Sequence, residues 1–142
     1  MLGGGPVGVE LAQAFARLGV NVTIFEKRKL LSNFSREQVE ILRVSLVEDG
    51  VSLKEDTCVN NISKVGGKLV VQLTNDDKIT GSHLLVATGK KPNLQNLNLQ
   101  AAGINYSDIG IQTDQYLRTN NKRIYAIGDV CLLYTSPSPR DK

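Results

Sequence analysis

Apolar residues near the start of the chain recur at the spacing of one helix face, directly after a glycine-rich turn. They are Val9, Leu11, Ala12, Ala14, Phe15 and Leu18. Because residues three and four apart lie on the same side of a helix, this spacing predicts a helix, and Gly19 predicts its end. Residues 20–25 follow as a short β-branched apolar run, which is typical of a buried parallel strand. The order of turn, helix and strand predicts part of a βαβ unit.

A second stretch with helical spacing lies at residues 35–49. Ser35 and Gln38 have the spacing of a capping box, in which a serine hydroxyl accepts a bond from a backbone N–H at the helix start. The apolar residues of this stretch that continue one face are Val39, Leu42, Leu46 and Val47. Gly50 predicts the end of the helix, and residues 51–54 predict the next strand.

The middle of the chain changes from helical spacing to alternation of apolar and polar residues. The alternation runs through residues 58–65, 68–74 and 77–80, which residues 66–67 (Gly-Gly) and 75–76 (Asn-Asp) separate. Such turn pairs between alternating runs predict an antiparallel meander of three strands.

Two shorter apolar runs, residues 83–87 and 124–127, predict further buried strands. After them the composition changes abruptly, because residues 131–142 show no periodicity and contain two prolines. We expect this tail either to be non-native sequence, since it is similar to translated vector sequence, or to be a natural disordered tail.

Composition and charge narrow the classes of function. The net charge of +3 is small and, apart from Lys27, Arg28 and Lys29, the basic residues are scattered among acids, so we expect no nucleic-acid partner. No apolar run approaches membrane-spanning length, so we expect no membrane partner. Cys58 and Cys131 form neither a CxxC pair nor a disulfide framework, and we expect a cytoplasmic protein without a metal site.

The opening glycines carry the first chemical signal. Gly3, Gly5 and Gly8 form G-x-G-x-x-G around Pro6 and Val7, and each glycine meets a different steric need of a pyrophosphate site. The first makes the strand-to-helix turn, the second lets the backbone approach the phosphates, and the third lets the helix pack close to the strand. The helix N-terminus adds unpaired N–H groups and partial positive charge, so these five residues are candidates for binding a dinucleotide. A short glycine pattern that only caps a helix is the alternative.

An acid at the end of the second strand supports the dinucleotide interpretation. Glu26 lies eighteen residues beyond Gly8, where an acid accepts bonds from the two ribose hydroxyls. A 2′-phosphate would face the same carboxylate, so we expect NAD rather than NADP. Lys27 is a further candidate cofactor contact, and the basic run that it begins is what a phosphate would favour, so NADP stays open. A solvated carboxylate at a strand end is the alternative role of Glu26.

Four motifs in a fixed order give the chain a family resemblance. They are residues 3–10, Glu26, residues 87–93 (Ala-Thr-Gly-Lys-Lys-Pro-Asn) and residues 125–129 (Tyr-Ala-Ile-Gly-Asp). With these motifs the chain resembles the pyridine nucleotide-disulfide oxidoreductases over about residues 1 to 130, and it looks closest to the branch of dihydrolipoamide dehydrogenase and mercuric reductase.

The resemblance implies roles for several further residues. Glu10 would lie beside the nicotinamide and the flavin and tune hydride transfer as the catalytic residue, paired with a lysine of the flavin domain. An exposed first-turn acid that favours the helix dipole is the alternative for Glu10. Gly89 would lie where the nicotinamide domain returns the chain and its backbone passes the cofactor, and Gly128 and Asp129 would bind the ribityl chain of FAD.

The fold expected from these observations is α/β, with a Rossmann-like dinucleotide-binding domain, a parallel sheet, an antiparallel β-meander and a stub of the FAD domain. Residues 1–90 would form the NAD(P)-binding domain with a truncated first strand, and residues 91–130 the return segment into the FAD domain. The resemblance implies a fragment, inactive by itself, of an FAD-dependent NAD(P)H:disulfide oxidoreductase whose parent binds NAD(H) and FAD and forms a homodimer. A stand-alone NAD-binding or redox-sensing module, and a fragment of an NADH oxidase or ferredoxin reductase, are the alternatives.

Overall fold

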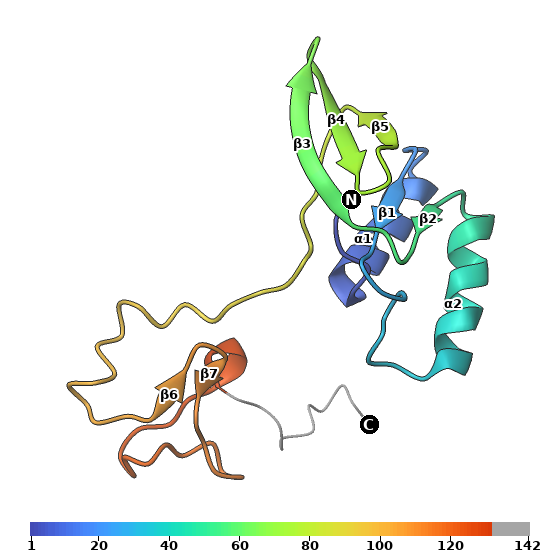
Figure 1. The fold of residues 1–142 in the computed structure, drawn as a ribbon. Helices are drawn as coiled ribbons and strands as arrows, with labels where there is room; N and C mark the ends of the chain where they lie inside the picture. Colours follow the sequence, from blue (N-terminus) through green and yellow to red (C-terminus); the bar gives the residue numbers. More distant parts are fainter. Residues whose placement is uncertain (132–142) are drawn as a thin grey trace. The chain divides into compact units, whose positions relative to one another are not determined.

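The computed structural model describes residues 1–131, and Figure 1 gives the order of the elements along the chain. Apart from Cys131, the predicted tail of residues 131–142 lies outside the described residues. The chain divides into two compact units, Met1–Gly89 and a second that begins at Lys90. Each unit is described by itself below.

The first unit begins with the predicted helix and strand. Helix α1 (Pro6–Arg17) ends in a Schellman motif, because the N–H groups of Gly19 and Val20 bond back to carbonyls of the last turn and Gly19 adopts a φ of 85°. Strand β1 (Thr23–Phe25) is shorter than the predicted run of residues 20–25, since that motif holds Val20 beside the helix end, where it is half exposed. The helix prediction is confirmed, and the first three residues of the strand prediction are wrong.

Helix α2 (Arg36–Glu48) confirms the second helical prediction, with two corrections. Ser35 is the residue before the helix, but its side chain makes no capping bond; instead Arg36 donates to the carbonyl oxygens of Leu30 and Leu31. Val47 is 55% exposed rather than buried, because it lies about 100° around the helix from the fully buried Leu46.

Strand β2 (Ser52–Lys54) pairs with β1 in parallel, as expected for strands joined by a helix. The next three strands, β3 (Val59–Val65), β4 (Lys68–Leu73) and β5 (Lys78–Gly81), form an antiparallel sheet in the order β3-β4-β5. The turn between β3 and β4 uses positive φ angles at Gly66 and Gly67, as a tight hairpin requires. The predicted meander is confirmed.

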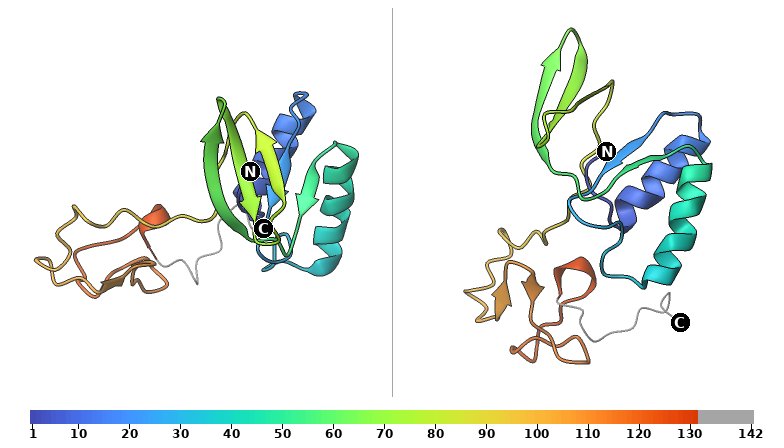
Figure 2. Two further views of the ribbon diagram at one scale, coloured as in Figure 1. Left: turned by 45° about the horizontal axis from the view of Figure 1, so that its top comes forward. Right: turned by 45° about the vertical axis from the view of Figure 1, so that its right-hand side comes forward.

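The parallel strands separate two layers of side chains. Ile24 of β1 belongs to one buried cluster with residues of both helices, while Phe25 belongs to another with Val71 and Leu73 of β4. Because neighbouring side chains of a strand point to opposite faces, the helices cover one face of β1 and the meander covers the other, as Figure 2 shows. The first unit is therefore a three-layer α/β structure of the Rossmann-like kind.

Residues 83–87 do not form the predicted strand. They make one parallel bridge, between Leu2 and Val86, and Leu2 also bridges Phe25 in parallel. The bridge is one residue long because Gly3, at a φ of 98°, turns the chain away toward α1. Leu2 therefore lies between β1 and residues 83–87, where a central strand of the parallel sheet belongs.

The second unit contains short elements around a small core. Strands β6 (Tyr106–Ser107) and β7 (Gly110–Ile111) pair antiparallel, and the 3₁₀ helix η1 (Gly128–Val130) follows. The buried residues are Leu99, Ile104, Ile111, Ala126 and Cys131. Residues 124–127, predicted as a buried strand, make only one bridge within the part of the chain that the structure describes, between Tyr125 and Arg118. Tyr125 and Ile127 are mostly exposed while Ala126 between them is buried, so the alternation is correct and the strand is not. Within residues 1–131, no helix has the length and apolar character needed to cross a membrane.

Candidate functional site

The glycine turn before α1 is packed so closely that two of its glycines are required by the fold. A Cβ on Gly3 would lie 2.4 Å from the carbonyl oxygen of Ala87, and a Cβ on Gly8 would lie 2.1 Å from the carbonyl oxygen of Gly3. A Cβ on Gly5 would meet nothing within 4 Å. The outer glycines therefore allow helix and strands to approach each other, while Gly5 leaves open space at the start of α1.

The start of α1 presents backbone donors. Pro6 is the first helical residue, and the N–H of Val9 donates to the carbonyl of Gly5 at 3.0 Å as the first helical bond. The N–H groups of Val7 and Gly8 precede that bond and have no acceptor within the helix. Together with the positive end of the helix dipole, this geometry suits an anion.

Glu26, directly after β1, is connected to the glycine turn. Its Oε2 accepts a bond of 2.7 Å from the N–H of Gly4, and its Oε1 accepts a bond of 3.1 Å from the N–H of Arg28. Each carboxylate oxygen keeps a second lone pair for a further donor such as a hydroxyl. Sequence reasoning did not assign a role to Gly4, although its place inside the glycine motif was a signal. The structure therefore brings Gly3, Gly5, Gly8 and Glu26 into one site.

The loop after Glu26 is bonded to Glu55, which follows β2. Glu55 accepts a bond of 2.7 Å from the N–H of Leu30 and one of 3.0 Å from Nε of Arg43 on α2. Burial opposes ionisation of Glu55, whose side chain is only 12% exposed, but these donors outweigh it and lower the pKa of the carboxyl below its usual 4.5. Through Glu55, the loop is thus bonded to the end of β2 and to α2.

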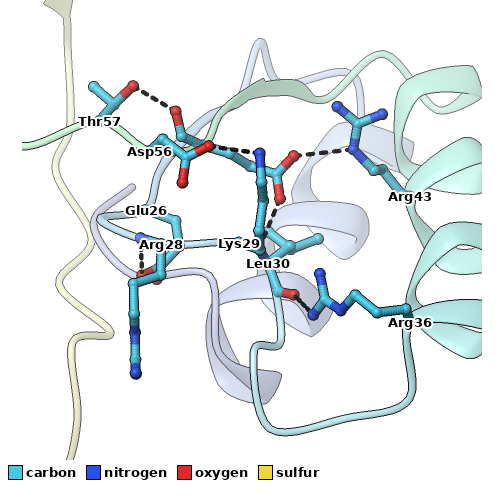
Figure 3. Close-up of polar contacts among 9 residues, drawn as sticks. Glu26, Arg28, Lys29, Leu30, Arg36, Arg43, Asp56 and Thr57 are labelled. Carbon is cyan, nitrogen blue, oxygen red and sulfur yellow. Dashed lines mark hydrogen bonds and ion pairs between the residues drawn. The ribbon is translucent and has the colours of Figure 1, made fainter.

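The three basic residues of this loop differ in their surroundings. The ammonium of Lys29 bonds the carboxylate of Asp56 at 2.5 Å, whereas the side chain of Arg28 points to the opposite side of the loop (Figure 3). Lys27 is exposed. Sequence reasoning missed both Glu55 and Asp56, whose signal was a pair of acids following the strand parallel to β1.

Glu10 is exposed on α1 and contributes to the wall of an open cavity of about 240 Å³. The cavity lies between α1, the loop from β1 to α2, and α2 itself. Its lining is mostly apolar: Pro6, Val9, Leu31, Phe34, Gln38, Val39 and Leu42 besides Glu10. The structure therefore places Glu10 on the same helix as the glycine turn, with its carboxylate open to solvent.

The remaining candidates lie at the end of the first unit and in the second. Gly89 has a φ of 143°, which favours glycine. Gly128 has a φ of 73° and begins η1, and Oδ2 of Asp129 forms an ion pair of 2.8 Å with Nζ of Lys90. Both side chains of that pair are about four-fifths exposed, 80% for Lys90 and 79% for Asp129. Among residues 1–131, no three His, Cys, Asp or Glu side chains gather as metal ligands would.

Comparison with known proteins gives a family match along nearly the whole chain. The family model described as pyridine nucleotide-disulphide oxidoreductase matches residues 1–141. Over 137 residues the chain is 38% identical to mercuric reductase of Streptomyces lividans, covering 92% of this chain and 28% of that protein. Over 135 residues it is 32% identical to dihydrolipoyl dehydrogenase of Staphylococcus aureus, covering 92% and 29%. The chain thus spans less than a third of the length of these relatives.

Solved structures show the same fold. The HOCl-induced flavoprotein disulfide reductase RclA from Escherichia coli matches with a TM-score of 0.82 and 31% identity, over 91% of this chain and 30% of that one. A water-forming NADH oxidase from Lactobacillus brevis, solved with NADH bound, matches with a TM-score of 0.77 over 92% and 29%. Its identity of 22% shows a common fold alone.

Proposed function

The chain belongs to the pyridine nucleotide-disulphide oxidoreductase family, and from this premise we propose that it binds NAD(H) within a longer FAD-dependent oxidoreductase. In the parent enzyme, hydride passes between the nicotinamide and the flavin, and the electrons then pass to or from a disulfide or a similar acceptor. Residues 1–90 form the NAD-binding domain, and residues 91–130 lead into the FAD domain, which is the partner of this chain inside a homodimeric parent.

One observation carries the proposal: the carboxylate of Glu26 is bonded to the N–H of Gly4 at the start of α1. This contact supports a site in which a dinucleotide has its diphosphate at the helix start and a ribose at the acid. The residues present fit such a group, because the space beside Gly5 is open and the first N–H groups of α1 precede the helical bonds.

The same contact bears on the choice between the two nicotinamide dinucleotides. Glu26 is held by two backbone N–H groups, so its carboxylate stays beside the glycine turn. A ribose with two free hydroxyls donates to that carboxylate, whereas a 2′-phosphate brings a like charge to it. NAD(H) is therefore the preferred dinucleotide, with Pro6, Val7 and Lys27 as further contacts.

Other roles follow the family pattern. Glu10, one turn into α1, holds its carboxylate toward the reacting nicotinamide and orients a cation of the FAD domain. Gly89 leaves its backbone free of a side chain beside the cofactor. Gly128 and Asp129 hold the ribityl chain of FAD, and Asp129 has to exchange or share its contact with Lys90 when it does so.

Titration calorimetry of the chain with NADH and with NADPH tests the proposal. NADH should bind more tightly than NADPH. Glu26→Gln should lower the affinity for NADH by about tenfold, which corresponds to the loss of a charge-assisted hydrogen bond of roughly 1.5 kcal/mol. The affinity for NADPH should not fall in Glu26→Gln, because the substitution also removes the negative charge that repels the 2′-phosphate. Glu37→Gln, which removes an exposed acid in the first turn of α2, is the matched control and should leave both affinities unchanged. Tighter binding of NADPH by the unmodified chain would contradict the assignment of NAD(H).

A further inference from the structure

Three basic residues, Lys27, Arg28 and Lys29, follow Glu26 directly. A basic side chain that reached the 2′-phosphate of NADP(H) would offset its repulsion by the Glu26 carboxylate and so weaken the preference for NAD(H). The structure distinguishes between them. Lys27 is exposed, and the side chain of Arg28 points away from that of Lys29 (Figure 3). The ammonium of Lys29, by contrast, forms an ion pair with Asp56, which follows the neighbouring strand β2. The availability of Lys29 is therefore set by its partner, Asp56.

Asp56 is fixed in place by the backbone on both sides of it. Its N–H donates to the carbonyl of Arg28 at 3.2 Å, and the N–H of Thr57 donates to the carbonyl of Glu26 at 2.9 Å. The chain beyond β2 thus runs beside the chain beyond β1, and the carboxylate of Asp56 comes to face the ammonium of Lys29. Asp56 also has a φ of 49°, in the left-handed region that aspartate and asparagine tolerate better than most residues.

The loop that carries Lys29 is held at the same time. The N–H of Leu30 donates to Glu55 and the carbonyl of Leu30 accepts from Arg36, so the backbone next to Lys29 is bound on two sides. The ammonium of Lys29 forms an ion pair with the carboxylate of Asp56. Among the described residues, it forms no ion pair within 4.0 Å with the carboxylate of Glu26. In agreement with this geometry, the hydrogen bond and the charge of Asp56 raise the pKa of Lys29 above its usual 10.5.

We propose that Asp56 is a specificity-determining residue of the dinucleotide site, because it holds Lys29 away from the Glu26 carboxylate and so leaves that charge free to disfavour NADP(H). The inference rests on the proposed binding of NAD(H) by this unit. Asp56 acts through Lys29 and does not itself touch the dinucleotide. Without Asp56, the ammonium of Lys29 is free to turn toward a 2′-phosphate.

Asp56→Asn tests this inference in the full 142-residue chain, because asparagine keeps the left-handed backbone and removes only the charge. Titration with each dinucleotide should show NADPH binding strengthened by about two- to fivefold, in the range of an exposed ion pair, and NADH binding unchanged. The gain should shrink at high salt, since both partners are exposed.

Two further variants separate a specific effect of Lys29 from a general effect of charge. Asp76→Asn makes the same change at another aspartate with a positive φ, in the turn between β4 and β5, and should leave the ratio of NADH to NADPH affinity unchanged. In a chain that already carries Lys29→Gln, Asp56→Asn should also leave the ratio unchanged, because the cation that it would release is gone.

Each outcome decides one of the two claims. If the unmodified chain binds NADH but Asp56→Asn leaves the ratio of NADH to NADPH affinity unchanged, this inference is overturned and the proposed function stands. An equal gain with Asp76→Asn, or a gain that survives Lys29→Gln, would overturn it in favour of a general charge effect. Binding of neither dinucleotide by the unmodified chain would contradict the proposed function and this inference with it.

Discussion

The two units of the chain are stabilised in different ways. In Met1–Gly89, two helices and a meander bury the two faces of the parallel strands, and the largest fully buried side chains, Ile24, Leu30 and Leu46, all lie there. In the second unit, up to Cys131, the strands are two residues long and the buried cluster has five members. The first unit is organised by the faces of its helices and strands, and the second depends more on bonds between side chains and the backbone.

A short polar segment shows how the second unit is connected. Asn120 accepts from the N–H of Asn105 at 2.8 Å and donates to the carbonyl of Gly103 at 2.6 Å. The hydroxyl of the buried Thr119 donates to backbone carbonyls, including that of Ile124, and accepts from the N–H of Asn121. Side-chain bonds of this kind replace the long strand ladders of the first unit, so the two units should respond to different mutations.

The largest effect should come from Leu46→Ala in the first unit. Leu46 is fully buried between α2 and the parallel strands, and its truncation should lower the free energy of unfolding by about 4 kcal/mol through lost burial and a new cavity. Urea unfolding followed by circular dichroism measures the change. Ile41→Ala on the same helix, where the side chain is 75% exposed, should change stability by less than about 1 kcal/mol. Equal losses for the two variants would refute the packing described for α2.

The next largest effect is expected for Gly8→Ala, which should lower the free energy of unfolding by about 3 kcal/mol. The added Cβ would overlap the carbonyl oxygen of Gly3, a backbone atom that no rotamer change can move. Gly5→Ala is the matched control in the same motif. It should cost no more than about 1 kcal/mol, the difference between glycine and alanine as an N-cap, since a Cβ there meets open space. The same urea experiment should therefore rank Gly8 above Gly5 for stability, while Gly5→Ala should weaken NADH binding.

Thr119→Val tests the second unit and should lower the free energy of unfolding by about 2 kcal/mol, because valine keeps the shape but removes the hydroxyl bonds of a buried residue and leaves the N–H of Asn121 without its acceptor. Thr113→Val, at a threonine for which no side-chain bond is found among the described residues, is the control and should be nearly neutral. Hydrogen exchange of the amides of Asn121 and Ile124 locates the effect. Unchanged exchange in Thr119→Val would show that these bonds do not hold the second unit.

The smallest effect concerns acidic pH. The folded chain lowers the pKa of Glu55, so below pH 4.5 the unfolded chain binds more protons and the stabilisation from Glu55 is lost as pH falls through the folded pKa. Glu55→Gln should therefore lower the free energy of unfolding by about 1 kcal/mol at pH 7 and by progressively less toward pH 3. Urea unfolding at each pH measures this difference. Hydrogen bonds from Arg118 and Tyr116 also lower the pKa of Asp114, but its side chain is 43% exposed, so Asp114→Asn should have the weaker pH effect. A loss in Glu55→Gln that is constant with pH would contradict this account.

The same contrast explains how much of the fold could be predicted from the sequence. The helices and the meander followed from local periodicity, since Val39 and Leu46 share a helix face and the two glycines after β3 define a hairpin. Residues 83–87 and 124–127 have strand-like patterns, but a strand needs a partner, and each segment has a single bridge among the described residues: Val86 with the distant Leu2, and Tyr125 with the nearby Arg118. Pattern alone does not determine the length of such pairings.

The site divides in the same way. Residue types and spacing were enough to select Gly3, Gly8 and Glu26, because close backbone approach and an acid at a strand end have few alternatives. A pair of acids after β2 was the only signal for Glu55 and Asp56. Their partners, Leu30 and Lys29, belong to a different strand end, and this pairing exists only once β1 and β2 lie side by side.

The proposed binding of NAD(H) at the start of α1, beside Glu26, can be followed at single residues. A ¹H–¹⁵N correlation spectrum of the chain, recorded while NADH is added, tests it residue by residue. The largest shifts are expected at the amides of Gly4, Gly5, Val7 and Gly8, which belong to the glycine turn and the start of α1, and a smaller shift at Arg28, whose N–H is bonded to Glu26. Unshifted amides in the glycine turn, with NADH-dependent shifts confined to residues beyond Lys90, would contradict it.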